Sequence, residues 1–242
     1  MAIQAAAIAV VLLVVLPLYI IYKPPVFFIN QLQRHSPSVL FHVPTTRKVV
    51  ALTIDDSPSD YTNSILAILK ANNATATFFV IGGQVSGREL ILKDILLAGS
   101  ELGNHGMHDE PSLNVPTPRL REEIDEVDSM INHAYETSGQ NRTMHLFRPG
   151  SGIFSDRVLD VAKDAGYRTI LGSIFPHDPF IPYWRVNAWH ILSSLRPGAV
   201  IICHDRRSWT VPMLKKVLPE MKKRGYDVVS VSGLLLDPQN ET

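Results

Sequence analysis

The sequence predicts a parallel, barrel-like α/β fold, and two observations lead to this prediction. From residue 47 onward, short apolar segments alternate with segments whose apolar residues recur at helical spacing. Several apolar segments end in polar clusters, as strands of parallel sheets do where they carry ligand sites. The region is somewhat short for the eight strand–helix units of a full barrel.

The first predicted strand is the apolar run from Val49 to Ile54, which ends in Asp55-Asp56 and Ser57-Pro58. Its residues are apolar without alternation, which indicates a strand buried on both faces. Successive strand residues point to opposite sides, so one carboxylate is free to bind a metal while the other accepts a proton. For the Asp-Asp pair alone, a helix cap beside a surface residue remains the alternative.

The remaining elements follow from apolar spacing and from the Gly, Asn and Pro residues between them. We expect strands over 75–81, 101–103, 169–171, 199–203 and 227–231, and helices over 61–70, 90–97, 117–137, 157–165 and 211–224.

Composition limits the kinds of partner and of metal site that the chain can have. The 242 residues include 23 basic and 23 acidic side chains, so no excess of positive charge favours nucleic acid as a partner. The single cysteine, Cys203, excludes an intramolecular disulfide and a cysteine-based zinc site. Nine histidines leave room for a metal site built on imidazole.

The N-terminus is apolar from residue 5 to residue 22, close to the ~20 residues that span a bilayer. A cleaved signal peptide is the alternative, but no basic residue precedes the run and no Ala-x-Ala follows it. We expect an uncleaved transmembrane signal-anchor over 1–23, a stem over 24–46 and a catalytic domain over 47–242. This implies a single-pass, membrane-anchored protein.

The sequence indicates less strongly on which side of the membrane the domain after the span lies. Lys23 and Arg34 follow the span and favour a cytosolic domain, whereas acceptor patterns at Asn73, Asn141 and Asn240 are compatible with export and glycosylation. We expect the catalytic domain to lie outside the cytosol.

Polar clusters follow three predicted strands: Asp55-Asp56, the run from Asn104 to Asp109, and His204-Asp205. Strand ends in parallel barrels converge on one face, so we expect these clusters to meet. Carboxylate and imidazole without thiolate suit zinc or another first-row divalent ion.

Five stretches, in this order, resemble the polysaccharide deacetylases of carbohydrate esterase family 4, the chitin-deacetylase-like group. They are residues 53–58 (TIDDSP), 101–105 (ELGNH), 147–150 (FRPG), 201–205 (IICHD) and 225–226 (GY). The resemblance covers residues 48–236. It implies a distorted (β/α)7 barrel and a metal-dependent hydrolase that removes N-acetyl groups from N-acetylglucosamine-containing, chitin-like polysaccharide.

Residue by residue, the resemblance implies that Asp55 is the general base and that Asp56 and His105 are metal ligands. It also implies that Arg148 holds the Asp55 carboxylate and that His204 is the general acid.

The chain departs from the family pattern at the third ligand. The family has His-x-x-x-His-Pro, whereas Asp109 stands four residues after His105 and His108 stands three after it. Either spacing places both groups on one side of a helical turn. We take Asp109 as the third ligand and keep His108 as the alternative. Zinc is expected, with cobalt or manganese as competitors for an Asp-His-Asp site.

Other positions transfer less directly. Pro149 and Gly150 stand where many relatives carry a substrate-binding Pro-Pro, Asp178 is a candidate for orienting His204, and Trp184 is a candidate wall of the sugar groove.

Two other functions stay open. One is a metal-dependent amidohydrolase that acts on another small or cyclic amide. The other is a catalytically inactive glycan-binding domain, although pure binding requires no paired base and acid.

Overall fold

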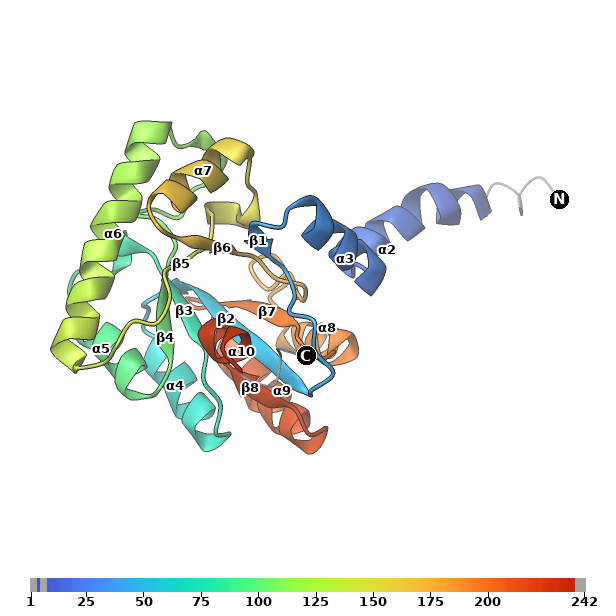
Figure 1. Ribbon diagram of the computed structural model, residues 1–242. Coiled ribbons are helices and arrows are strands. Elements are labelled where there is room, and N and C mark those ends of the chain that lie inside the picture. The colour runs from blue at the N-terminus through green and yellow to red at the C-terminus, as the bar shows by residue number, and fades with distance from the viewer. Residues whose placement is uncertain (1–3, 5–7, 238–242) are drawn as a thin grey trace.

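The strands form one curled, fully parallel sheet in the computed structural model, which describes residue 4 and residues 8–237 (Figure 1). The order is β1-β6-β5-β4-β3-β2-β7, and β8 pairs with β2. The strands are β1 (Val39–Leu40), β2 (Val49–Ser57), β3 (Thr77–Val80), β4 (Glu101–Asn104), β5 (Leu146–Phe147), β6 (Arg168–Ile170), β7 (Val200–His204) and β8 (Asp227–Val229).

The predicted parallel α/β architecture is therefore confirmed, and the described residues contain eight strands where seven were expected. The eighth arises because β8 pairs with the start of β2, on the side where β3 pairs with its later half. The segment after β6 bridges to β7 through Ile174 and Ile201, which draws the two sides of the curled sheet together.

Helices cover the outside of the sheet. They are α4 (Thr62–Ala71), α5 (Glu89–Leu97), α6 (Thr117–Ser138), α7 (Asp156–Asp164), α8 (Trp184–Ser194) and α9 (Thr210–Lys223), with short 3-10 turns at η2 (Gly82–Gln84), η3 (Ser112–Asn114) and η4 (Gly150–Gly152). Apolar spacing did not predict α8, because the residues it buries include Asn187 and His190.

Two apolar clusters explain why the sheet curls around a core. Leu52 and Ile54 of β2 pack outward against the helices, whereas Ala51 packs inward with residues from the other strands. Helix α10 (Val231–Leu235) places Val231 and Leu234 in the inner cluster, at the end of the barrel where β2 begins. The opposite end, where β2 finishes, is left for polar side chains.

The N-terminal segment comprises η1 (Val11–Val15), α2 (Leu16–Tyr22) and α3 (Val26–His35), and it projects from the side of the domain (Figure 1). In the part of the chain that the structure describes, no unbroken helix meets the length and hydropathy of a bilayer span. The bent pair Ile8–Tyr22 and Val26–His35, which turns by 69°, passes the same test by length and composition.

Candidate active site

The C-terminal ends of neighbouring strands bring the predicted residues together. Asp55 of β2 is the register partner of His204 at the end of β7. His105 follows β4, where its backbone N–H donates to Val80 of β3 at 2.9 Å. Arg148 follows β5, and its backbone N–H donates to the carbonyl of Asn104 at 2.9 Å. Strands that are distant in sequence thus deliver their polar ends to one cluster.

The end of β2 is irregular, and this decides where its two carboxylates point. The register with β3 shifts between Ile54 and Ser57, and Asp56 has a left-handed backbone with φ +61°. Such a conformation in a non-glycine residue costs about 1–3 kcal/mol and occurs preferentially at functional sites. Both carboxylates consequently face the cluster, with different partners, instead of pointing to opposite sides of the sheet.

Asp55 is held by a fully buried arginine. The Arg148 guanidinium ion-pairs with Asp55 Oδ1 and donates to Thr53 Oγ1 at 2.7 Å. Its other N–H groups donate to the carbonyls of Ile170 and Leu171, both at 3.1 Å. Burial lowers the pKa of Arg148, while the Asp55 carboxylate opposes that shift. This network fixes one Asp55 oxygen and leaves Oδ2 directed at His204.

His204 is oriented by Asp178, which is completely buried. Asp178 accepts from His204 Nδ1 at 3.0 Å and from the His204 backbone N–H at 2.8 Å. Nε2 of His204 then lies 3.9 Å from Asp55 Oδ2, across a gap with no direct hydrogen bond. Burial would lower the pKa of His204, but Asp178, then Asp55 and Asp56, raise it to about 9. His204 is therefore protonated at neutral pH.

Asp56 and His105 form a second pair, and no direct hydrogen bond joins its members. His105 Nδ1 lies 2.7 Å from the Arg148 carbonyl, so this nitrogen donates to that oxygen and Nε2 is the ring nitrogen that faces Asp56. Nε2 lies 3.8 Å from Asp56 Oδ1, too far for a hydrogen bond. Burial raises the pKa of Asp56, with opposing effects from His105 and His204. A carboxylate and an imidazole nitrogen that face each other without a direct hydrogen bond in a buried site are residue types that fit a divalent cation.

The third predicted ligand is not gathered with these two. Among residues 8–237, no group of three or more His, Cys, Asp or Glu side chains is placed to hold a metal ion. Asp109 is exposed and pairs with Arg206 at 3.2 Å, although its charge still raises the pKa of Asp56. His108 is also exposed. Asp56 and His105 thus have the residue types and positions that fit a divalent ion, whereas Asp109, the expected third ligand, pairs with Arg206 instead.

The predicted substrate-binding residues do not line a groove beside the clustered carboxylates and histidines. Pro149 and Gly150 are buried, and a side chain at Gly150 would meet the Glu110 carbonyl at 2.0 Å, so this turn packs against the loop after β4. Trp184 lines a groove between α8 and α9 whose lining contains none of the clustered carboxylates and histidines.

Three residues of the cluster were not singled out from the sequence. Arg207 places its guanidinium 3.8 Å from Asp56 Oδ2, and Arg206 holds Asp109. Asp205, to which the sequence analysis gave no role beyond its place in the third polar cluster, is buried and accepts hydrogen bonds from Ser57, Ser59 and Thr62. Its position directly after His204 was the available signal.

Comparisons with known proteins identify the family of the chain. The polysaccharide deacetylase family model matches residues 42–170. The chain is 36% identical to the peptidoglycan-N-acetylglucosamine deacetylase of Bacillus cereus, over 81% of this chain and 92% of the relative. It is 30% identical to the peptidoglycan-N-acetylmuramic acid deacetylase PdaA of Bacillus subtilis, over 81% and 74%.

Among solved structures, a carbohydrate esterase family 4 pseudoenzyme from Bacillus anthracis superposes with a TM-score of 0.74 at 29% identity. The match covers 83% of this chain and 69% of that one. Shared sequence, shared fold and the strand-end cluster lead to one conclusion: the chain belongs to the polysaccharide deacetylase family.

Proposed function

We propose that the chain is a metal-dependent deacetylase that hydrolyses N-acetyl groups of N-acetylglucosamine units in a chitin-like or peptidoglycan polysaccharide. The observation that carries this proposal is the placement of an acid beside a base. Asp55 Oδ2 and His204 Nε2 face each other across 3.9 Å, and each is fixed from behind by its own buried partner. A domain that only bound glycans would not require this pair.

The residues divide the work as follows. Asp55 Oδ2 takes a proton from the attacking water, while the ion pair with Arg148 holds the carboxylate in place. His204 donates its Nε2 proton to the departing amine, and Asp178 stabilises the imidazolium until then. A divalent ion held by Asp56 and His105 would polarise the acetamide carbonyl and the water. Zinc suits these donors, with cobalt or manganese as competitors, and Asp109 is the proposed third donor.

The test is acetate release by the full chain in detergent, with N-acetylglucosamine oligomers and peptidoglycan glycan strands as substrates. We expect release that a chelator stops and that zinc, cobalt or manganese restores. Asp55→Asn is expected to lower the rate by at least about a hundredfold, because it removes the general base. Asp60→Asn, which changes an exposed carboxylate paired with Arg88, is the matched control and leaves the rate unchanged.

A second function is supported by two observations: Asp109, the expected third ligand, is paired with Arg206, and a pseudoenzyme is among the structural relatives. On this alternative the domain binds glycan without turnover. Oligomer binding that is unaffected by chelator, with no acetate released under any metal, would establish it and reject the hydrolase.

We also propose that residues 1–23 anchor the protein in a membrane, that 24–46 connect the anchor to the domain, and that residues 47–242 act outside the cytosol. Apolar side chains of the described N-terminal helix, such as Leu13 and Ile21, are 77% and 70% exposed, which supports an apolar environment for them. Carbonate-resistant membrane association and digestion of the domain by protease added outside intact cells would be the expected results.

A further inference from the structure

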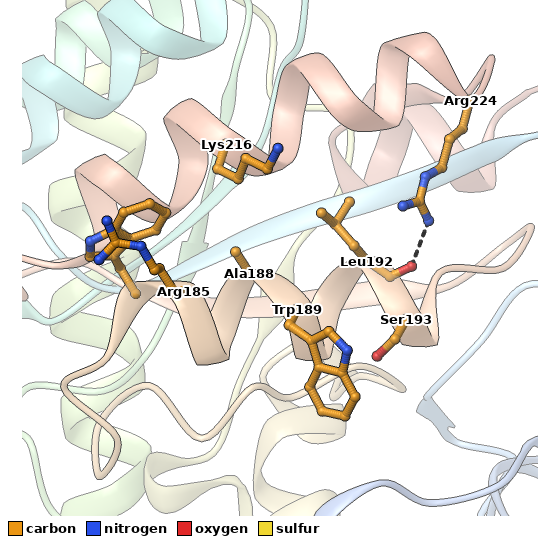
Figure 2. A pocket seen from close by; sticks show the side chains of 8 residues that line it. Arg185, Ala188, Trp189, Leu192, Ser193, Lys216 and Arg224 are labelled. Carbon is orange, nitrogen blue, oxygen red and sulfur yellow. Dashed lines mark hydrogen bonds between the residues drawn. The ribbon is translucent and has the colours of Figure 1, made fainter.

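A groove of about 540 Å³ lies between α8 and α9, on the outer face of the barrel (Figure 2). Its wall on α8 is mostly aromatic and apolar but includes Arg185, and the side formed by α9 and the residue after it is basic. The lining includes Trp184, Arg185, Trp189, Leu192, Lys216 and Arg224. No residue of the deacetylase cluster lines it, so the proposed reaction does not account for this groove.

The groove carries positive charge that the described chain balances only in part, through the Glu220 carboxylate, which interacts electrostatically with Lys216 and Arg224. Arg185 lies 4.4 Å from the ring centroid of Trp184. Within residues 8–237, neither Arg185 nor Lys216 forms an ion pair with a carboxylate. Arg224 is already held, by Glu220 at 3.0 Å and by the Leu192 carbonyl at 2.7 Å. A guanidinium over an indole ring, with the Lys216 ammonium in the same groove, favours an anionic ligand with an apolar part.

The apolar N-terminal helix ends against the same helix, α8. Lys23, directly after α2, donates to Ser193 Oγ at 2.8 Å and lies 5.1 Å from the ring centroid of Trp189. Tyr22 stacks on His177 at 5.0 Å and meets the edge of His190 at 4.7 Å. These contacts fix the end of the helix against the groove.

These contacts fix the position of the groove relative to the N-terminal helix, and so relative to any membrane that the helix enters. If the exposed apolar helix enters a bilayer, the membrane surface lies near its last residues, where aromatic and basic side chains are enriched. Trp189, which is 54% exposed, and Lys23 occupy that level. The groove that they border then opens among lipid headgroups.

We propose that the groove between α8 and α9 binds the phosphate headgroup of an anionic phospholipid in the membrane that holds the N-terminal helix. Arg185 and Lys216 pair with the phosphate, and Trp189 packs against the glycerol and upper acyl region. The inference rests on the proposed membrane attachment and is independent of deacetylation. Binding would set the orientation of the catalytic domain on the membrane.

The experiment titrates the full chain, in non-ionic detergent, with dihexanoyl-phosphatidylglycerol and separately with dihexanoyl-phosphatidylcholine, and follows tryptophan fluorescence. We expect a saturable change with the anionic lipid and a much weaker response to the zwitterionic one. Arg185→Gln with Lys216→Gln should weaken the affinity about thirtyfold, since each cation near a lipid surface contributes about 1 kcal/mol.

Two control variants keep the result interpretable. Lys70→Gln with Lys163→Gln removes the same charge from exposed sites on α4 and α7 and should bind like the wild type. Arg185→Lys with Lys216→Arg keeps the charge and should retain binding. Equal affinity for both lipids, equally tight binding of inorganic phosphate, or equal weakening in the control would overturn the proposal.

Flotation of the full chain with phosphatidylcholine vesicles tests the attachment separately. A chain that stays at the bottom of the gradient would overturn the headgroup site by removing its premise. Acetate release from soluble oligomers should be the same in the Arg185→Gln, Lys216→Gln variant, so failure of either proposal is recognised without the other.

Discussion

The two halves of the candidate site differ in whether their polar side chains have hydrogen-bond partners within the protein. In the acid–base half, Asp55 and His204 each have a buried partner, Arg148 and Asp178, within hydrogen-bonding distance. In the proposed metal half, Asp56 and His105 face each other across 3.8 Å without a direct hydrogen bond, and Asp109 pairs with Arg206 instead. The comparison teaches that the fold itself fixes the groups proposed for proton transfer, whereas the proposed metal ligands lack such partners and leave room for an added cation.

Breaking the acid–base half should have the largest effect. Arg148→Met leaves the Asp55 carboxylate buried without its cation, so we expect a loss of about 3–5 kcal/mol in the free energy of unfolding, measured with urea. Arg121→Met, which breaks an exposed pair with Asp125 on α6, should cost less than about 1 kcal/mol. Adding Asp55→Asn to Arg148→Met should recover part of the loss; a double variant as unstable as the single one would show that packing, and not charge, dominates.

The pH dependence of the metal-free chain tests the same half through His204. Its pKa in the folded protein, about 9, lies above the ordinary value of 6.5. A raised pKa in a cationic group stabilises the fold fully below about pH 6.5, and this stability is lost as the pH rises through 9. Urea unfolding with chelator present should therefore show a decrease over that range, of at most about 3 kcal/mol.

Asp178→Asn should remove most of that decrease, because Asp178 is the foremost cause of the raised pKa. In assays of acetate release, the same variant should lower kcat/KM by about a hundredfold. The alkaline limb of the pH profile of kcat/KM should move to lower pH. An unchanged limb would mean that His204 is not the group that titrates.

Added metal ion should raise the free energy of unfolding through Asp56 and His105, and variants of the acid–base half should not remove this gain. A metal at about a hundred times its Kd should raise the unfolding free energy by about 2.7 kcal/mol. Asp56→Asn should abolish this gain, and it should stabilise the metal-free chain because burial opposes the charged form of Asp56. Asp55→Asn serves as the control, in which the gain persists. A gain that survives Asp56→Asn would place the ion elsewhere.

The smallest expected effect distinguishes the two candidates for the third ligand. If Asp109 binds the ion, Asp109→Asn should weaken metal affinity by about tenfold in calorimetric titration, within the range of ligand-shell substitutions. His108→Gln should then leave the affinity unchanged. The reverse result would assign the role to His108 and would leave Asp109 as the partner of Arg206.

The strand ends were predictable because their signal is local. The apolar run before Asp55-Asp56 and the run before His204 each mark a buried strand, and parallel strands present their C-terminal ends on one face. The roles of Arg148 and Asp178 came from the resemblance, and the structure places both beside the residues they were expected to hold. Helix α8 was missed because the polar residues it buries hide the helical period.

The sequence by itself determined which chemical groups stand at which strand ends, and so the family and the acid–base pair. Only the tertiary structure decided the partners: Asp109 with Arg206, Asp56 near Arg207, and Lys23 against α8. The physical reason is that apolar periodicity is encoded over a few neighbouring residues. Pairing depends on loops with left-handed residues such as Asp56 and Arg206, and on contacts between segments far apart in the chain, which no local pattern specifies.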